Sequence, residues 1–281
     1  MVVLRMILFL LPGFLGSRLL VALAGKKFEY RYRDEEKDWM ERVEQFSYGM
    51  GKYAWRAGQG PVVVLVHGYG GVAAQWYKIA DMLVKAGYCV VAPDITAHGS
   101  TRGDKIRFRS FIDDLKQLEG VLNEDIYAYV GHSAGGLCMM AGRRVHGLKA
   151  RKYVCIATPS YPYPPIKVMR KKIQPPEKVI GGYQDFLGRQ FGCEWDDIVA
   201  HCFDFETGNN LLLVYDENDK YLEPGDLENI RQYWLEVKVL ITTDAGHEQL
   251  LRSDVCIEKV GAFLQGGIAG GSQMSSPGEG R

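Results

Sequence analysis

Short apolar runs alternate with segments of helical spacing over most of this chain, and this alternation limits the folds that are open to it. Residues 62–66 form a continuous apolar run, as expected of a strand covered on both faces. Residues 73–86 then carry large apolar side chains at helical spacing. Further strands are expected over residues 88–92, 126–130, 152–157, 211–215 and 237–242, and further helices over residues 109–122, 135–146 and 248–264. The pattern predicts an α/β fold, a mainly parallel sheet flanked by helices.

Two stretches depart from this alternation. Residues 45–48 and 52–56 alternate apolar and polar side chains around Gly49-Met50-Gly51, which predicts an antiparallel hairpin. Residues 160–205 begin with a crowd of prolines and continue with helix-like stretches. A loop of that length needs its own structure or function, so we expect a short helical lid inserted there. One domain that contains this insertion is expected over residues 26–265, and the Gly- and Ser-rich tail, residues 266–281, is expected to be disordered.

The N-terminal segment, residues 1–25, is apolar. Arg5 precedes the run 6–11, and Ala22-Leu23-Ala24 imitates a signal-peptide cleavage site. Arg18 shortens the run below the ~20 residues that a membrane span needs, and Pro12 and Gly13 disfavour one regular helix. Three interpretations stay open: residues 1–24 pack on the domain or contact a membrane surface peripherally, form a cleaved signal peptide, or form a weak transmembrane anchor. We expect a cytoplasmic protein, which is membrane-associated if the first interpretation holds. If residues 1–24 are a signal peptide, the protein is exported instead.

The composition argues against several classes of partner. Lys plus Arg and Asp plus Glu both number 34, so no net charge attracts nucleic acid. The six cysteines lack the spacing of a disulfide framework or a zinc site, and only Cys193 and Cys202 form a pair worth testing for a bridge. The histidines make no metal-binding motif, and no glycine-rich segment carries a nucleotide-binding signature. We expect no metal, no cofactor and no nucleic acid.

One serine lies between a predicted strand and a predicted helix. Residues 131–135 read Gly-His-Ser-Ala-Gly and follow the apolar run 126–130. Flanking glycines let a chain turn sharply, which exposes the serine hydroxyl above the sheet and leaves the next backbone N–H free to meet an oxyanion. The context predicts that Ser133 is a nucleophile.

A serine nucleophile needs a base and an acid downstream. Asp219 follows the predicted strand 211–215, and His247 follows the predicted strand 237–242. Asp216 and Glu217 compete with Asp219, but Asp219 lies further beyond the strand, where its side chain can reach His247. We expect Asp219 as the acid and His247 as the base.

An oxyanion hole needs two converging N–H donors. The residue after the nucleophile, Ala134, is the first. The second is expected in the Gly-rich turn 67–71, directly after the strand 62–66, where glycines allow close approach to the substrate. The N–H of Tyr69 is the candidate.

From about residue 46 to residue 264 the chain resembles the α/β-hydrolase superfamily. The resemblance rests on the segments 64–71, 91–94, 97–100 and 131–136, on Asn218-Asp219 and on Gly246-His247. More narrowly, the chain is similar to bacterial carboxylesterase-like serine hydrolases with a short helical lid. The resemblance implies Ser133 as nucleophile, Asp219 as acid and His247 as base, and the chain order of the three is that of the superfamily.

These observations predict a serine hydrolase that cleaves a small-molecule carboxylic ester through an acyl-enzyme. The bulky Tyr69 beside the oxyanion hole and the small lid favour a short or medium acyl chain. Other acyl or C–C bond hydrolases, such as an amidase, a thioesterase or a ring-cleavage-product hydrolase, stay open. So does a non-catalytic binding protein of this fold. The sequence fixes neither the physiological substrate nor the oligomeric state.

Overall fold

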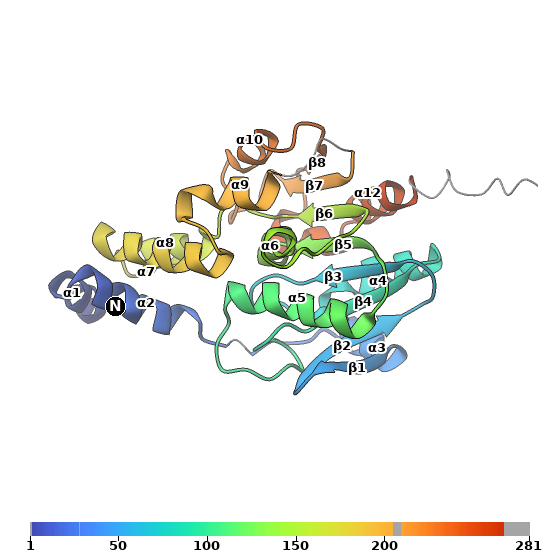
Figure 1. Ribbon diagram of the computed structural model, residues 1–281, viewed down its shortest axis with the longest axis horizontal. Coiled ribbons are helices and arrows are strands. Elements are labelled where there is room, and N and C mark those ends of the chain that lie inside the picture. The colour runs from blue at the N-terminus through green and yellow to red at the C-terminus, as the bar shows by residue number, and fades with distance from the viewer. Residues whose placement is uncertain (1, 28, 205–208, 267–281) are drawn as a thin grey trace, which may run out of the picture.

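An eight-stranded sheet forms the centre of the computed structural model, which describes residues 2–27, 29–204 and 209–266 (Figure 1). The strand order is β1-β2-β4-β3-β5-β6-β7-β8, with antiparallel β1/β2 and β2/β4 pairs and parallel pairs from β4 to β8. The strands are β1 (Glu44–Gly49), β2 (Lys52–Ala57), β3 (Val62–Val66), β4 (Cys89–Pro93), β5 (Ile126–His132), β6 (Lys152–Ile156), β7 (Leu211–Asp216) and β8 (Lys238–Thr242). The predicted fold class is confirmed, and so is the antiparallel hairpin predicted over residues 45–56, which is formed by β1 and β2.

Helices cover both faces of the sheet. On one face lie α5 (Phe108–Leu122) and α6 (Ala134–His146), and on the other lie α3 (Asp34–Arg42), α4 (Tyr77–Lys85) and α12 (Asp254–Gln265) (Figure 1). Successive residues of β3 therefore enter two different cores. Val64 packs in the core under α5 and α6, whereas Val63 and Leu65 pack in the core under α4 and α12. This two-sided burial explains why the central strands are continuous apolar runs.

Short helices complete the chain near the carboxyl ends of the strands. Between β6 and β7 lie α7 (Pro164–Lys172), α8 (Glu177–Phe191), the 3₁₀ turn η2 (Trp195–Asp197) and α9 (Ile198–Phe203). These are the inserted helices, and they fall within the segment predicted as a lid; its residue 205 lies outside the described residues. The remaining elements are η1 (Ala73–Trp76), α10 (Asp226–Arg231), α11 (Gly246–Gln249) and η3 (Leu250–Arg252). Gly266 ends the described chain, so the tail predicted to be disordered lies beyond it.

The N-terminal segment forms two helices, α1 (Val2–Leu10) and α2 (Gly13–Ala24), which we call the N-terminal hairpin. Pro12 separates them, in agreement with the prediction that one regular helix is disfavoured. Helix α2 packs on α8 of the inserted helices, and Figure 1 shows α1, α2, α7 and α8 gathered at one end of the molecule. Among the described residues, no helix has the length and apolarity that a membrane span requires.

Close contact between α2 and α8 depends on glycine. A Cβ atom built on Gly16 would lie 2.6 Å from a methyl group of Val179, and a Cβ on Gly182 would lie 2.7 Å from the hydroxyl of Ser17. Both distances are below any normal van der Waals contact. Valine in a helix has one strongly preferred rotamer, so Val179 cannot turn aside cheaply.

We expect Gly16→Ala to destabilise the protein relative to the matched variant Gly120→Ala. Gly120 lies in helix α5, where an added Cβ meets no atom within 4 Å. Both substitutions gain the same helix propensity, so their difference isolates the overpacking against Val179, about 1–3 kcal/mol in the free energy of unfolding. Urea unfolding of the two variants measures it. Equal stability would mean that α2 does not pack on α8 as described.

Candidate active site

Ser133 occupies a strained turn between β5 and α6. Its φ of 51° and ψ of −122° lie where side chains other than glycine rarely occur, and its N–H donates to the carbonyl of Ile156 at 2.8 Å. The glycines around it are required by contact. A Cβ on Gly135 would overlap the carbonyl oxygen of His67, and a Cβ on Gly131 would overlap the first turn of α6. The packing of α6 against β3 and β5 therefore holds the serine in the turn that the sequence predicts.

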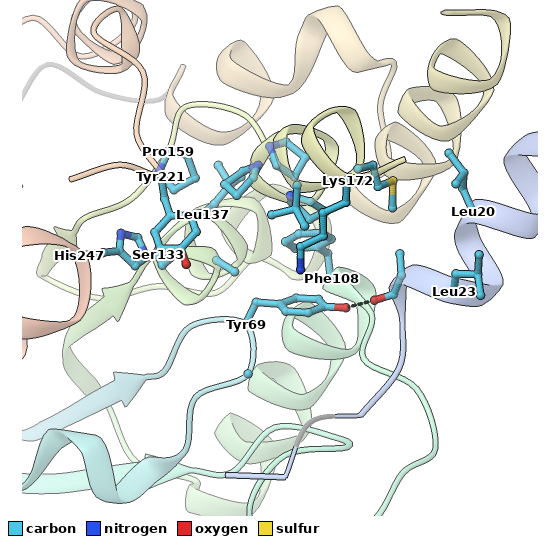
Figure 2. A pocket seen from close by; sticks show the side chains of 18 of the residues that line it. Leu20, Leu23, Tyr69, Phe108, Ser133, Leu137, Pro159, Lys172, Tyr221 and His247 are labelled. Atoms are coloured by element: carbon cyan, nitrogen blue, oxygen red, sulfur yellow. Dashed lines mark hydrogen bonds between the residues drawn. The ribbon is translucent and has the colours of Figure 1, made fainter. Parts of the chain in front are cut away.

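A cavity of about 700 Å³ opens beside Ser133. Figure 2 shows Ser133 and His247 at one end of it and Leu20 and Leu23 of α2 at the other. The two sequence-predicted oxyanion donors, Tyr69 and Ala134, also line this cavity. Most of the remaining wall is apolar and comes from the N-terminal hairpin and the inserted helices: Leu4, Ala24, Pro162, Pro164, Pro165, Val168, Met169 and Ile173.

Asp219 and His247 are in contact. Asp219 lies in the loop after β7 and His247 in the turn after β8, and His247 Nδ1 is 2.6 Å from Asp219 Oδ2. The Asp219 side chain is fully buried, and its other oxygen accepts the N–H of Tyr221 at 2.9 Å. A carboxylate only accepts hydrogen bonds, so Nδ1 carries the proton and Nε2 is the basic nitrogen. In the described chain no hydrogen bond joins Nε2 to Ser133, although both residues line the same cavity.

Asp216, the competing carboxylate, has a different set of partners. It accepts hydrogen bonds from the Thr242 hydroxyl at 2.7 Å, from the Ala245 N–H at 2.9 Å and from the Asn218 N–H at 2.9 Å. Burial raises the pKa of Asp216, but these hydrogen bonds outweigh burial and hold the pKa below its ordinary value. Asp216 therefore ties the end of β7 to the turn before His247, whereas Asp219 is the carboxylate that contacts the imidazole.

Two buried histidines hold the loop that carries Tyr69. His67 Nε2 accepts the N–H of Ile95 at 3.1 Å, and His98 Nε2 accepts the N–H of Gly70 at 3.1 Å. A ring nitrogen that accepts an amide proton is itself unprotonated, so both rings are neutral with the proton on Nδ1. Burial lowers the pKa of His67 to about 4 and that of His98 to about 3. The histidine directly after β3 therefore ties the loop at the end of β3 to the backbone after β4.

His132, one residue before Ser133, supports the other side of the site. Its Nε2 donates to the backbone carbonyl of His247 at 3.0 Å, and the two rings lie 4.8 Å apart. Burial lowers the pKa of His132 to about 3, with the neighbouring His247 as the next cause. His132, which lies in the turn that carries Ser133, therefore holds the backbone of His247, the proposed base.

The sequence analysis missed two contacts. The ring of Tyr221 meets the ring of His247 edge-on at 4.8 Å, which restricts the imidazole plane. The Tyr69 hydroxyl donates to the carbonyl of Ala24, the last residue of α2, at 2.6 Å (Figure 2). Tyr221 could have been suspected because it lies two residues after Asp219, but nothing in the sequence pairs residue 69 with residue 24.

Among the described residues, the cysteines form no disulfide, and the cysteine, histidine and acidic side chains form no cluster that could hold a metal ion. All six cysteines are free, including Cys193 and Cys202, and five of them are buried. Within the same part of the chain no group of three or more histidine, cysteine or acidic side chains is arranged to hold a metal ion.

Comparison with known proteins shows which family model and which solved structures this fold resembles. Residues 61–183 match the family model described as the alpha/beta hydrolase fold, which spans β3 to α8 and includes Ser133. The chain has the α/β-hydrolase fold, and over this segment it is similar to that family. An esterase from Pyrococcus furiosus superposes on this chain with a TM-score of 0.62 at 19% identity, covering 86% of this chain and 97% of the esterase. At that identity the likeness shows the fold alone.

Curated relatives align with only a part of this chain. A monoacylglycerol lipase from Mycolicibacterium smegmatis is 34% identical over 94 residues, which is 31% of this chain and 34% of the lipase. The magnesium-chelatase 30 kDa subunit of Rhodobacter capsulatus is 38% identical over 80 residues, or 27% of this chain and 28% of the subunit. The aligned region spans about a quarter of the length of the first mycobacterial relatives.

The buried histidines make the stability of this protein depend on pH. His67, His98 and His132 have pKa values of about 4, 3 and 3 in the folded state, against 6.5 for an exposed histidine. At a pH between these values, the three histidines are therefore protonated in the unfolded chain and neutral in the folded chain. Their stabilising contribution is complete above about pH 6.5 and is lost as the pH falls toward about 3, with a slope of up to about 1.4 kcal/mol per pH unit for each histidine.

Urea unfolding between about pH 8 and about pH 5 tests this dependence. The buried Asp94, whose pKa is raised by burial, acts in the opposite direction, but it is one group against three. In the matched variant His98→Gln, the amide oxygen can take the place of Nε2 and accept the Gly70 N–H, and the side chain no longer titrates, so the slope becomes about one third shallower. A free energy of unfolding that stays constant over this range would contradict the assignment of neutral buried rings.

Proposed function

We propose that this protein is a serine hydrolase that cleaves a carboxylic ester through an acyl-enzyme. One observation carries the proposal. Ser133 stands in a strained strand-to-helix turn and shares a cavity with His247, whose Nδ1 is held by the buried Asp219 at 2.6 Å. These are the parts that activate a serine: a nucleophile, a base beside the same cavity, and an acid that fixes the tautomer of the base.

The first half of the reaction transfers the acyl group to the enzyme. The Ser133 hydroxyl attacks the ester carbonyl carbon, and His247 Nε2 takes the hydroxyl proton. The imidazolium that forms is stabilised by the carboxylate of Asp219 across the 2.6 Å contact. The C–O bond to the alcohol then breaks, and the alcohol leaves with the proton from Nε2. The acyl group stays on Ser133 as an ester.

The carbonyl oxygen gains negative charge in each tetrahedral intermediate, and the N–H groups of Tyr69 and Ala134 are the donors that we assign to it. Ala134 begins α6, where backbone N–H groups lack partners within the helix and the helix dipole favours negative charge. Tyr69 belongs to the loop that His67 and His98 hold in place. A loop that is fixed before the substrate arrives does not need to reorganise during the reaction.

The second half releases the acid. A water molecule gives one proton to His247 Nε2 and attacks the acyl carbon. The bond from that carbon to Ser133 Oγ breaks, and the proton on Nε2 returns to the serine. The products are a carboxylic acid and the regenerated enzyme.

The cavity supports an apolar acyl group. Its volume of about 700 Å³ lies in the upper part of the range for small-molecule sites, and most of its wall is apolar. The predicted preference for short or medium chains rested on Tyr69 and on the small inserted segment, without the wall that α2 adds. With that wall the cavity also favours longer chains. A kcat/KM series from acetyl to palmitoyl esters decides between the two.

We expect Ser133→Ala to lower kcat for a p-nitrophenyl ester by at least ~10³-fold, because loss of the nucleophile removes the acyl-enzyme route. Ser47→Ala is the matched control, since Ser47 is exposed in β1 and does not line the cavity. It should keep full activity. A folded Ser133→Ala protein as active as the control would assign the chemistry to another group, and an inactive wild type would favour a binding function.

Substitutions of Asp219 and Asp216 are predicted to change different properties: catalysis for Asp219 and stability for Asp216. Asp219→Asn should lower kcat by about 10⁴-fold with little loss of stability, because asparagine fills the same space but favours the wrong tautomer of His247. Asp216→Asn should lower the free energy of unfolding by about 1–3 kcal/mol and affect kcat much less, since it replaces one of the two carboxylate oxygens that together accept three hydrogen bonds by an NH2 group that cannot accept. Kinetics and urea unfolding of both variants provide the comparison. The opposite ranking in kcat would move the acid role to Asp216.

A further inference from the structure

The N-terminal hairpin exposes apolar side chains in an unusual concentration. Leu10 is 84% and Val3 is 69% exposed, and further large apolar residues are exposed on the same two helices: Met6, Ile7, Phe9, Phe14, Leu15 and Leu23. The opposite side of the hairpin is packed on the domain through Leu8 and Leu20, which are fully buried. The hairpin is therefore seated by one face and carries an unpartnered apolar surface on the other. Clusters of this kind mark interaction sites rather than ordinary protein surface.

The exposed apolar surface adjoins the mouth of the cavity. Leu23 of α2 is 47% exposed and Val168 of α7 is 41% exposed, and both line the cavity that contains Ser133. Figure 2 shows Leu23 at the end of the cavity away from Ser133. A molecule that enters past Leu23 therefore comes directly from the apolar surface and meets an apolar wall on its way to the serine.

The charge around this surface is mainly positive, although Arg170 of α7 pairs with Glu177 at 2.8 Å. The first 28 residues contain four basic residues, Arg5, Arg18, Lys26 and Lys27, and the first acidic residue of the chain is Glu29. Helix α7 ends in Arg170-Lys171-Lys172 beside the same mouth. Because the whole chain has no net charge, this basic excess is local to the hairpin and α7. Exposed apolar side chains bordered by basic ones are complementary to an anionic lipid surface.

We propose that the N-terminal hairpin docks on an anionic lipid bilayer and that the cavity takes a single-chain acyl ester from it. The two short helices lie on the bilayer, with Leu10, Phe14 and their neighbours in the acyl region and the basic residues at the headgroups. The ester reaches Ser133 while the acyl chain lies along the wall formed by α2 and α7. A cavity of about 700 Å³ suits one acyl chain rather than two. The substrate part of this proposal rests on the proposed function, whereas the docking part does not.

Docking is linked to the catalytic loop by one hydrogen bond. The Tyr69 hydroxyl donates to the carbonyl of Ala24, where α2 ends, and the backbone of Tyr69 belongs to the proposed oxyanion hole. A shift of α2 on the bilayer therefore reaches the loop after β3 through the Tyr69 side chain.

The test uses the full chain and vesicles of phosphatidylcholine, with and without phosphatidylglycerol. Wild type should sediment with the anionic vesicles and less with the neutral ones, and added salt should weaken the binding because it screens the basic residues. Replacing Val3, Met6, Leu10 and Phe14 by serine should lower the partition coefficient by roughly tenfold or more, since four apolar side chains no longer enter the lipid. None of these four lines the cavity.

The matched control replaces four exposed apolar residues elsewhere: Met50, Val121, Leu235 and Val255. It should bind vesicles as wild type does. Both variants should hydrolyse soluble p-nitrophenyl acetate at the wild-type rate, while only the hairpin variant should lose activity on monooleoylglycerol carried in anionic vesicles. Equal vesicle binding by the two variants would overturn the docking proposal. So would a wild type that dimerises through the hairpin and leaves the vesicles in solution.

This experiment can contradict the docking proposal and the proposed function independently of each other. Vesicle binding without hydrolysis of either ester would overturn the proposed function and leave docking intact. Hydrolysis of the soluble ester without vesicle binding would do the reverse. The Ser133→Ala variant should bind vesicles like wild type, and loss of binding in that variant would contradict a docking surface that is independent of the catalytic residue.

Discussion

The close packing of α6 against β3 and β5 is the constraint on which the rest of the site depends. This packing brings the first turn of α6 so near the carbonyl of His67 that only glycine fits at position 135. The same contact forces Ser133 into a backbone conformation with a φ of 51°. Strain of this kind persists only where the surroundings hold it, here by the hydrogen bond to Ile156 and by two fully buried cores.

Neutral buried histidines extend that constraint to the loops around the cavity. His67 and His98 accept backbone protons from one side of the site, and His132 donates to the backbone of His247 on the other. None of the three can gain a proton without losing a hydrogen bond or burying a charge. His247 differs from them, because its Nδ1 contacts a carboxylate and its ring lines the cavity. Four histidines close together thus divide into three that hold the scaffold and one that suits proton transfer.

The sheet and the residues that lie just beyond its strands could be predicted from the sequence. Strands such as β3 are apolar at every position because they are covered on both sides, and Asp219 and His247 follow strands whose carboxyl ends share one edge of the sheet. The structure brings these two side chains together as the spacing suggested. Which of the carboxylates Asp216 and Asp219 meets the imidazole depended on loop geometry, and the sequence pattern alone favoured Asp219 only by its distance from the strand.

Several helices outside the strand–helix alternation, including those at the far end of the cavity, were harder to predict. Helix α3 carries mainly charge around the buried Trp39, so its apolar stripe is too narrow to read. Pro164 and Pro165 read as helix breakers, yet both lie in the first turn of α7, where proline is well tolerated. The contact of Gly16 with Val179 joins residues far apart in the sequence, and no local pattern announces it. The sequence therefore did not indicate that the N-terminal hairpin forms part of the cavity wall, and only the structure shows it.

The central claim is that Ser133 is an activated nucleophile, and a fluorophosphonate probe tests it most directly. The probe forms a covalent bond only with a serine whose hydroxyl is made nucleophilic by a base. Mass spectrometry of the labelled full chain should find one adduct, on Ser133, and His247→Ala should abolish it while the protein stays folded. No adduct on the wild type, an adduct on another serine, or undiminished labelling of His247→Ala would contradict the account.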